Sequence, residues 1–294
     1  KEQREAIAPT LFSLAELQKS ANLAYKMTPD RTLEVAQKLY ESGYITYPRT
    51  DSRYLPVDMV PELQDHLKAL YSIPDIGLFA QAVTQEDIAR VVAGKVYIDD
   101  CKIADHHAII PTEDAPPWQA LSNDEKKLYL LTAKQFVAIF MGPYKADTTA
   151  VLVQVGKNLF RCDGIVVTDK GYVQLYRAKR ENIILPDIAE GDIVILKDTA
   201  ITSGWSKAPA RYTPRTLIAA MQNAGKSLSD TNQRSILKEA VGLGTSATRA
   251  KILSDMIGRG YLELSSNQYR PSNYAIRLIQ LFRTRNFCSP ELTA

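Results

Sequence analysis

The chain has 294 residues, of which 45% are hydrophobic and 23% charged, and its formal net charge is +3. This length predicts two or three structural units with cores of their own, and the composition is typical of a globular protein. The mild basic excess, with a pI of about 8.6, permits anionic partners without demanding them. We expect neither membrane insertion nor secretion, since no apolar run approaches about 18 residues and no signal-peptide pattern is present. The cysteines Cys101, Cys162 and Cys288 lie far apart, which indicates neither a zinc site nor disulfides and favours a reducing cytoplasmic compartment.

Residues 13 to about 142 show mostly helical patterns. Ser13 and Glu16 form a capping-box pattern ahead of an apolar repeat. Thr28-Pro29 predicts a second helix start and Gly43 its end. The apolar stripe of that helix comprises Leu33, Ala36, Leu39 and Tyr40. A third helix is expected from about Asn123, where a polar cap precedes acidic residues.

Residues from about 144 to 203 show a strand-like pattern in place of the helical one. TTAVLVQV, NLFRCDGIVVTD, GYVQLYR and GDIVILKD are short, rich in β-branched residues and separated by Gly, Asn and Asp turns. This pattern predicts a small antiparallel β unit of such strands. SGWSKAPARYTP, rich in Pro, Ser and Lys, is expected to be the linker that leaves it.

A second helical unit is expected beyond the linker. Thr213-Pro214 predicts a helix that ends at Gly225, a further helix is expected over about 230–240, and a third follows the turn GLG. YLELSSNQYRPSNYAI predicts a hairpin with SSN at its tip. Three helices and a hairpin suggest a winged helix that binds nucleic acid, whereas the alternative is a structural helical lobe. The pattern alone favours neither.

The segment ESGYITYPRTDSRYL places Tyr47 directly before a proline. A residue in that position is pushed out of the helical region, so the chain after Gly43 should be extended, with Tyr47 and Arg49 on one side. A phenol is a weak nucleophile at neutral pH, but a guanidinium beside it can hold a phosphate and favour the phenolate. This pairing is what attack of a tyrosine on a phosphodiester requires. The alternative, a core tyrosine with Arg49 paired to Asp51, is the commoner outcome for an arbitrary Tyr-x-Arg.

Three further segments carry weaker chemical signals. In DHHAIIPT, His106 or His107 could donate to a phosphate or relay a proton, or be bonded to backbone; their spacing with Asp105 disfavours a metal site. NAGKS lacks the upstream glycine and strand of a phosphate loop, so ATP binding there is rejected. GLGTSATRAKIL sets hydroxyls and free amides at a helix start, which suits either a phosphate or an ordinary cap.

The sequence contains one basic segment before the second helical unit and lacks a common magnesium-binding motif. The basic segment comprises Lys207, Arg211, Tyr212 and Arg215, and it is compatible with a strand-binding groove without being specific for one. No two aspartates are separated by one residue, so the sequence lacks a magnesium site of the DxD type.

Taken together, these segments resemble the type IA DNA topoisomerases, in their topoisomerase III branch. The blocks that carry the resemblance follow the family order over essentially the whole chain: LFSLAELQKSAN, TLEVAQKLYESGYITYPRTDSRYL, DHHAIIPT, ARYTPRTLIAAMQNAG, GLGTSATRAKIL and SPELTA. The tyrosine block is the most specific of them. The resemblance favours a functional role over a structural one for Tyr47, Arg49 and His106.

The resemblance implies a role for each matching residue. Tyr47 would attack a DNA phosphate and hold the 5′ end, Arg49 would contact the scissile phosphate, and His106 would support cleavage. The residues implied to lie near DNA are Asp51 and Thr248, with Arg249 as a weaker match and Arg211 from the basic segment. His107 occupies a position that is acidic in some relatives and is left out.

The chain also departs from the family pattern. Members begin with a Toprim domain that carries a catalytic glutamate, a lysine and an acidic magnesium site, and none of these precedes Lys1. We therefore expect an internal fragment of a longer protein, in an α+β multidomain fold from a toroidal clamp. The expected domains are residues 1–12 as the end of a first β-domain segment, 13–143 as the helical domain with the tyrosine, 144–206 as the β hinge or arch, and 207–294 as a partial, winged-helix-like DNA-binding domain.

The implied activity is transient cleavage of one DNA strand, passage of another strand and religation, without ATP. Mg²⁺ would be held by the Toprim domain of the parent enzyme, and the partner would be single-stranded or underwound DNA in the cytoplasm of a bacterium, at the nucleoid or a plasmid. We expect a monomer. The alternatives are a non-enzymatic single-stranded DNA-binding module and another tyrosine transesterase, a relaxase or recombinase. A relaxase would require three histidines that bind one metal ion. The spacing of His66, His106 and His107 does not suit such a site.

Overall fold

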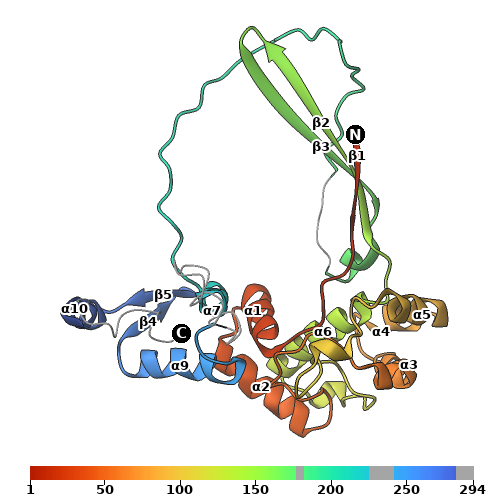
Figure 1. Cartoon of the computed structure of the whole chain (residues 1–294), viewed down its shortest axis with the longest axis vertical. Coiled ribbons are helices and arrows are strands. Elements are labelled where there is room, and N and C mark those ends of the chain that lie inside the picture. Colours follow the sequence, from red (N-terminus) through yellow and green to blue (C-terminus); the bar gives the residue numbers. More distant parts are fainter. Residues whose placement is uncertain (177–181, 225–241, 283–294) are drawn as a thin grey trace. The chain divides into compact units, whose positions relative to one another are not determined.

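The computed structural model describes residues 1–176, 182–224 and 242–282. The chain forms two compact units, one from Lys1–Pro9 with Ala138–Pro209 and one from Thr10–Val137 with Ala210–Ala294 (Figure 1). The helix expected over 230–240, the helix end at Gly225, Cys288 and SPELTA lie outside the described residues. Helices and antiparallel strands are both present, as the predicted α+β class requires. In the described ranges no helix is long and apolar enough to cross a membrane.

The β unit is built on one antiparallel sheet in the order β1-β2-β3. Its strands are β1 (Glu2–Ala6), β2 (Tyr144–Val155) and β3 (Asn158–Asp169). β2 and β3 are a hairpin whose end pair is Val155 with Asn158, and Gly156 supplies the positive φ of +60° that the tight turn needs. Its small core comprises Tyr144, Ala146 and Val173, with Ile165, Val167 and Tyr172 packed against them.

Two of the strands predicted for the β unit are absent, and that part of the prediction is wrong. Gly171–Tyr176 is a 3₁₀ helix, η4. Its first residue has a φ of +45°, and a Cβ there would lie 2.2 Å from the Pro143 carbonyl oxygen. Residues 191–198 form no regular element, although they are rich in β-branched residues. A strand needs a neighbour for its backbone groups, and no described strand pairs with this segment.

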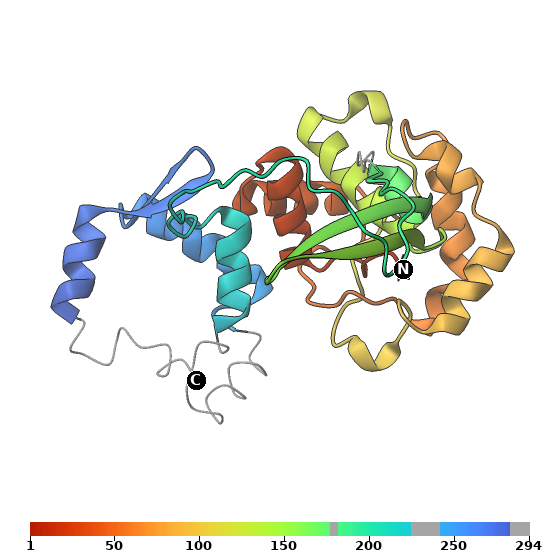
Figure 2. The same ribbon diagram turned by 90° about the horizontal axis from the view of Figure 1, so that it is seen from above.

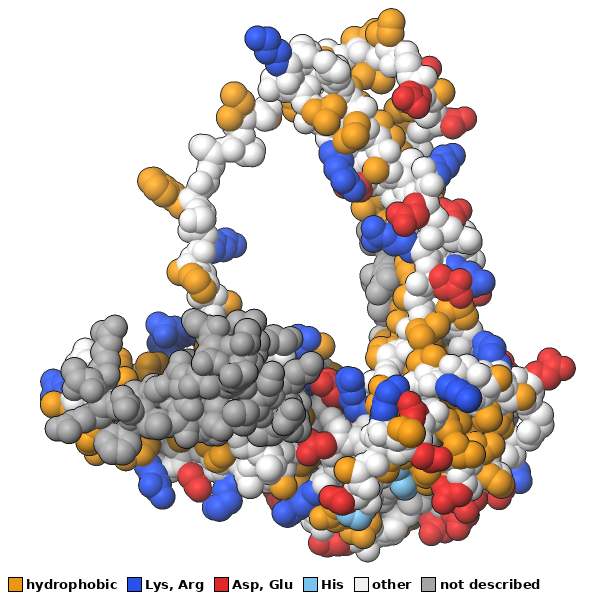
Figure 3. Space-filling view, viewed as in Figure 1, with side chains coloured by type: hydrophobic (Ala, Val, Ile, Leu, Met, Phe, Trp, Pro, Cys, Tyr) orange, Lys and Arg blue, Asp and Glu red, His pale blue; other side chains and the backbone are white. Residues whose placement is uncertain are grey.

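The apolar residues of the extended chain between β3 and α7 are exposed. Figure 3 shows orange side chains standing singly along this trace, and the exposed fraction is 96% for Ile193, 86% for Ile195, 99% for Ile201 and 99% for Trp205. This segment therefore contributes little burial of its own.

The other unit begins with helices whose starts agree with the sequence signals. α1 (Leu14–Tyr25) is capped by Ser13, whose side chain accepts from the Glu16 amide, and α2 (Pro29–Glu41) is capped by Thr28. The remaining helices of this part are α3 (Leu63–Ala69), α4 (Gly77–Gln81), α5 (Gln85–Gly94) and α6 (Asn123–Ala138), with the 3₁₀ helices η1 (Val57–Glu62), η2 (Asp100–Lys102) and η3 (Trp118–Ala120). Fully buried side chains of its core include Leu14, Leu17, Leu39, Leu55, Leu67, Tyr129 and Phe136.

The elements after the linker belong to the same unit, and α7 and α9 pack on α1. They are α7 (Pro214–Gln222), α9 (Ser246–Gly258), β4 (Leu262–Ser265), β5 (Gln268–Pro271) and α10 (Asn273–Phe282). β4 and β5 confirm the predicted hairpin, with Ser266 and Asn267 at positive φ in its tip. Their shared core contains Ala15 of α1 with Ile218, Leu253 and Tyr269. α1 lies between α7 and α6 (Figure 1, Figure 2). Since one expected helix lies outside the described residues, the winged helix stays a prediction.

Candidate active site

The segment that carries Tyr47 starts from the end of α2. The Gly43 amide donates to the Tyr40 carbonyl at 2.8 Å, and the Tyr44 amide donates to the Leu39 carbonyl at 2.9 Å. Gly43 has a φ of +80°, so these two bonds form the Schellman arrangement that ends a helix at a left-handed glycine. The helix therefore stops where the sequence predicts, and the chain runs on extended toward Tyr47.

A second segment, residues 106–112, holds that extended chain in place. The Thr46 amide donates to the Ile110 carbonyl at 2.9 Å, and the Thr46 hydroxyl donates to the Ala108 carbonyl at 3.0 Å. The Ile110 amide in turn donates to the Thr46 hydroxyl at 3.0 Å, and the Thr50 hydroxyl donates to the His106 carbonyl at 2.8 Å. Bonds on both sides of Tyr47 thus fix it opposite the histidine segment.

The rings of Tyr47 and His106 lie against each other as a result. Their centroids are 4.4 Å apart with the planes tilted by 47°, and Tyr47 is half-buried while His106 is exposed. The phenol is therefore supported by protein and still reachable from solvent. Two residues 59 positions apart in the sequence meet here, as the resemblance implied.

Tyr40 is a member of this site that the sequence did not single out. Its ring meets that of Tyr47 edge-on, with centroids 5.3 Å apart and an interplanar angle of 77°. The sequence analysis placed Tyr40 in the buried stripe of α2, but 39% of it is exposed. An aromatic on the polar side of the last helical turn, just before the extended segment, is the signal that could have indicated it.

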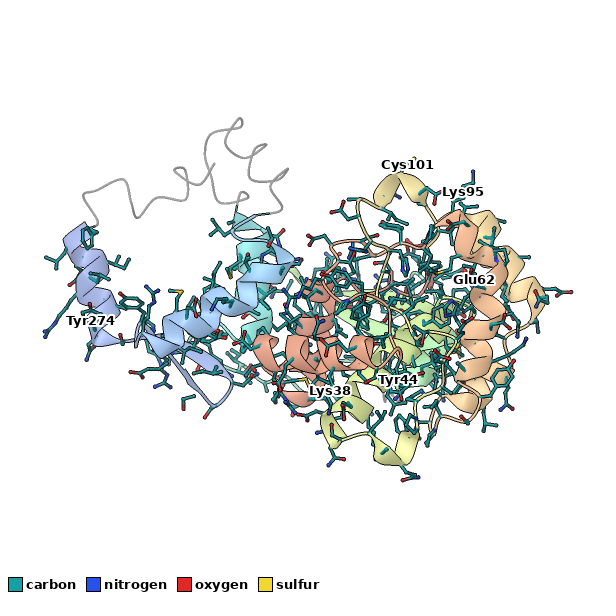
Figure 4. The ribbon with its side chains drawn as sticks, turned by 90° about the horizontal axis from the view of Figure 1, so that it is seen from below. Lys38, Tyr44, Glu62, Lys95, Cys101 and Tyr274 are labelled. Carbon is teal, nitrogen blue, oxygen red and sulfur yellow. The ribbon has the colours of Figure 1, made fainter. Side chains whose placement is uncertain are left out.

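Arg49 is exposed on the same segment and faces α2. It lines a groove together with Asp30, Leu33, Glu34, Gln37, Lys38 and Glu41; Lys38 and the nearby Tyr44 are labelled in Figure 4. Among the described residues Arg49 has no hydrogen-bond or ion-pair partner, so the alternative pairing with Asp51 is not found. A guanidinium that no protein group engages is available to an anionic ligand.

The start of α9 contacts Asp51 through Ser246. The Ser246 hydroxyl donates to Asp51 Oδ1. Thr248, exposed, accepts a hydrogen bond from the Thr245 amide at 2.9 Å and therefore acts as part of the helix cap. Arg211 is exposed on the segment beside β5, where the Tyr269 amide donates to the Tyr212 carbonyl at 2.7 Å.

Arg249 does not have the position expected of a DNA contact. Its exposed fraction is 0%. Its guanidinium donates through Nε to the Leu243 carbonyl at 3.0 Å and through Nη2 to the Gly244 carbonyl at 2.6 Å. Arg249 is thus committed to the turn before α9, and the expectation of direct DNA contact is wrong for this conformation because the side chain is buried.

The other two histidines each have a ring nitrogen beside a backbone carbonyl. His107 is half-buried, its Nδ1 lies 2.9 Å from the Ala108 carbonyl, and burial lowers its pKa. His66 is buried with Nδ1 3.0 Å from the Pro111 carbonyl. Across the described ranges no group of three or more His, Cys, Asp or Glu residues could hold a metal ion. These residues therefore do not fit a magnesium site.

Comparisons with known proteins show which family the chain is similar to. A family model described as DNA topoisomerase matches residues 1–294. The chain is similar to DNA topoisomerase 3 of Bacillus licheniformis, with 36% identity over 100% of this chain and 41% of the relative. It is 35% identical to DNA topoisomerase 3 of Bacillus subtilis with the same coverage. The chain thus spans less than half the length of these curated relatives.

A solved structure shares the fold. Full-length topoisomerase I from Thermotoga maritima matches 99% of this chain and 45% of that chain, with a TM-score of 0.68 and 20% sequence identity. At this identity the likeness concerns the arrangement of the elements alone.

Proposed function

The chain belongs to the DNA topoisomerase family, and we propose that it carries the nucleophile and the phosphate-binding groups of a type IA enzyme that cleaves and rejoins single-stranded DNA. The family is one of enzymes, and the predicted resemblance to its topoisomerase III members is confirmed. The single observation that supports the site assignment most is the half-buried Tyr47 ring, held beside His106 by bonds on both sides of it.

The proposed reaction is an ester exchange. Tyr47 Oη bonds to a DNA phosphorus while the bond from that phosphorus to the 3′ oxygen of the preceding nucleotide breaks. The phenolic proton leaves Tyr47, and the departing 3′ oxygen takes up a proton. Religation reverses each step, so one phosphodiester replaces another and no ATP is needed. Passage of a second strand through the gap between the two steps changes the linkage of the DNA.

His106 and Arg49 supply what a phenol lacks at neutral pH. The exposed His106 imidazole, against the Tyr47 ring, can donate to a phosphate oxygen or relay the proton. The Arg49 guanidinium offers a fork of donors that matches two phosphate oxygens and favours negative charge developing there. Both act by position and charge, which suits a reaction that conserves bond energy.

DNA contacts are proposed at the start of α9 and on the segment before α7. Thr248 and Arg211 are exposed there, and free amides at a helix start suit a phosphate. In this proposal residues 1–12 and 144–206 belong to the hinge or arch, 13–143 to the tyrosine domain and 207–294 to the DNA-binding domain of a toroidal clamp. The protein would act as a monomer on single-stranded or underwound DNA in a bacterial cytoplasm, with Mg²⁺ held by a further domain.

Covalent trapping tests the nucleophile. The full gene product that contains this chain, with Mg²⁺, should trap a single-stranded oligonucleotide labelled at its 3′ end and should release the label of one marked at its 5′ end. Tyr47→Phe should abolish trapping, because no phenolic oxygen remains. Tyr44→Phe is the matched control, a half-buried tyrosine of the same segment, and should still trap. Persistent trapping by Tyr47→Phe would place the nucleophile elsewhere.

Trapping by neither protein would favour the second candidate, a non-enzymatic single-stranded DNA-binding module. That candidate has one observation in its favour, the lack of a metal-holding cluster in the described ranges.

Arg49→Lys tests the phosphate role separately from the nucleophile. A point charge replaces a planar fork, so the rate of cleavage should fall by about tenfold or more while oligonucleotide binding changes much less. Arg53→Lys on the same segment, whose guanidinium lies 4.0 Å from Glu16, is the control. Equal losses of binding and cleavage in Arg49→Lys would argue against a role in the transition state.

A further inference from the structure

The start of α9 is joined to the segment of Tyr47 by a side-chain contact that the proposed reaction does not use. Ser246, the first residue of α9, is 2% exposed and donates its hydroxyl to Asp51 Oδ1. Asp51 lies four residues beyond the nucleophile, whereas Ser246 lies 195 positions away in the sequence. A buried hydroxyl bound to a carboxylate is a charge-assisted bond, which is stronger than one between neutral groups.

Arg249 adds an electrostatic component to the same contact. Its fully buried guanidinium has carbonyl oxygens of Leu243 and Gly244 as partners. Burial lowers the pKa of Arg249, and the Asp51 charge opposes that effect. The carboxylate of the tyrosine segment therefore favours the charged form of an arginine that organises the turn before α9.

Asp51 is itself coupled tightly to the catalytic groups. The neighbouring Thr50 accepts a bond at its carbonyl from the Leu14 amide at 3.0 Å, and its hydroxyl donates to the His106 carbonyl at 2.8 Å. A displacement of Asp51 is thus transmitted through Thr50 to His106 and to the segment that carries Tyr47.

We infer that Asp51 and Ser246 form a latch that holds the start of α9 in register with the nucleophile's segment, while Arg249 holds the turn before α9 through the Leu243 and Gly244 carbonyls. They are positioning residues, and the inference that they influence cleavage rests on the proposed function. A strand bound at the start of α9 would then present its phosphate to Tyr47 at a set spacing. The latch also replaces the expected role of Asp51 as a DNA contact, because a carboxylate beside a phosphate is repelled by it.

Hydrogen exchange on this chain tests the latch without any catalysis. Ser246→Ala and Asp51→Asn should each raise amide exchange about tenfold in residues 44–55 as well as in 242–252, since the first removes the bond and the second removes the charge that strengthens it. Ser272→Ala is the matched control: its hydroxyl accepts from the Ala275 amide at 3.1 Å at the start of α10, and within the described ranges it makes no hydrogen bond to the segment that carries Tyr47. It should leave 44–55 unchanged.

The exchange outcomes decide the inference by themselves. A rise confined to 242–252 would show an ordinary helix cap and overturn the latch, as would no change in either region. The double variant Asp51→Asn with Ser246→Ala should show no greater rise than Ser246→Ala alone, because the same bond is already lost in that single variant. These results stand whether or not Tyr47 is the nucleophile.

Cleavage by the full gene product tests whether the latch influences the reaction at Tyr47. Ser246→Ala and Asp51→Asn should lower the rate of covalent trapping about tenfold at saturating oligonucleotide, with affinity unchanged or higher. Asp51→Glu should recover part of the rate because it keeps the charge, and Asp255→Asn, an equal charge change elsewhere on α9, should behave as the unmodified protein. Weaker binding with an unchanged rate would instead make Asp51 a DNA contact and sink the latch.

Discussion

Two extended stretches of this chain, residues 43–55 and residues 191–205, behave in opposite ways. The first is bonded to segments far away in the sequence, through Thr46 to residues 108 and 110 and through Thr50 to residues 14 and 106. The second has local bonds such as that of the Asp192 amide to the Ala189 carbonyl, and its apolar side chains are exposed. Both are rich in residues that favour extended chain. An extended segment is therefore defined by its partners, and only the partnered one can hold a reactive side chain in place.

The largest expected effect on this contrast comes from Thr46→Val. The isosteric change removes the bond to the Ala108 carbonyl and leaves the amide of the buried Ile110 without its acceptor. We expect the free energy of unfolding to fall by about 2–3 kcal/mol. Urea unfolding followed by circular dichroism measures it.

Thr199→Val provides the matched control in the exposed stretch, because the Thr199 hydroxyl makes no hydrogen bond within the described part of the chain. It should stay within about 0.5 kcal/mol of the unmodified protein. If both variants lost the same free energy of unfolding, the bonds of the first stretch would not stabilise the protein more than the second stretch does.

A smaller effect is expected at Tyr40, which tests whether the partners of the first stretch orient the nucleophile itself. Tyr40→Leu removes the edge-on contact with Tyr47. Because such contacts contribute about 0.5–1.5 kcal/mol, we expect single-turnover cleavage to slow by up to about tenfold with little change in oligonucleotide affinity. Tyr40→Phe keeps the ring and should restore the rate. A Phe variant as slow as the Leu variant would point to the hydroxyl instead.

The local signals of the sequence predicted the helices well for a physical reason. A cap such as Ser13 or Thr28 and a left-handed Gly43 act within a few residues of themselves, so the chain's own pattern specifies where α1 and α2 begin and where α2 ends. Strands depend on neighbours that a single segment does not encode. This is why residues 191–198 were predicted as a strand and form none.

In the candidate site, too, the local features could be predicted from the sequence and the tertiary contacts could not. The extended chain at Tyr47 follows from Gly43 and Pro48, but its meeting with His106 came from the resemblance and not from the pattern. Tyr40 and the bond between Ser246 and Asp51 were missed because each is a tertiary contact of a residue that looks ordinary in its own segment.

The smallest expected effect is a pH dependence of the helix that leads into the partnered stretch. Glu125 Oε1 accepts from Lys38 Nζ of α2 at 2.8 Å, and its Oε2 accepts from the Ser122 amide at 2.7 Å. The bond from Lys38, followed by those from Ser122, lowers the pKa of Glu125 to about 2. A carboxyl whose folded pKa is depressed stabilises the fold fully above its unfolded value of about 4.3 and loses that contribution as the pH falls toward the folded value.

Thermal unfolding across this acid range should therefore show a loss of stability that Glu125→Gln largely lacks, the two curves meeting near pH 2. Glu34→Gln is the control, since its carboxylate is 70% exposed in a surface pair with Arg31 and such pairs contribute little. If Glu125→Gln kept the full acid loss, α2 would not be held to α6 by this carboxylate. The end of α2, and with it Tyr40, would then be held by other contacts, among them the Schellman bonds at Gly43 and the ion pair of Arg31 with Asp124 of α6.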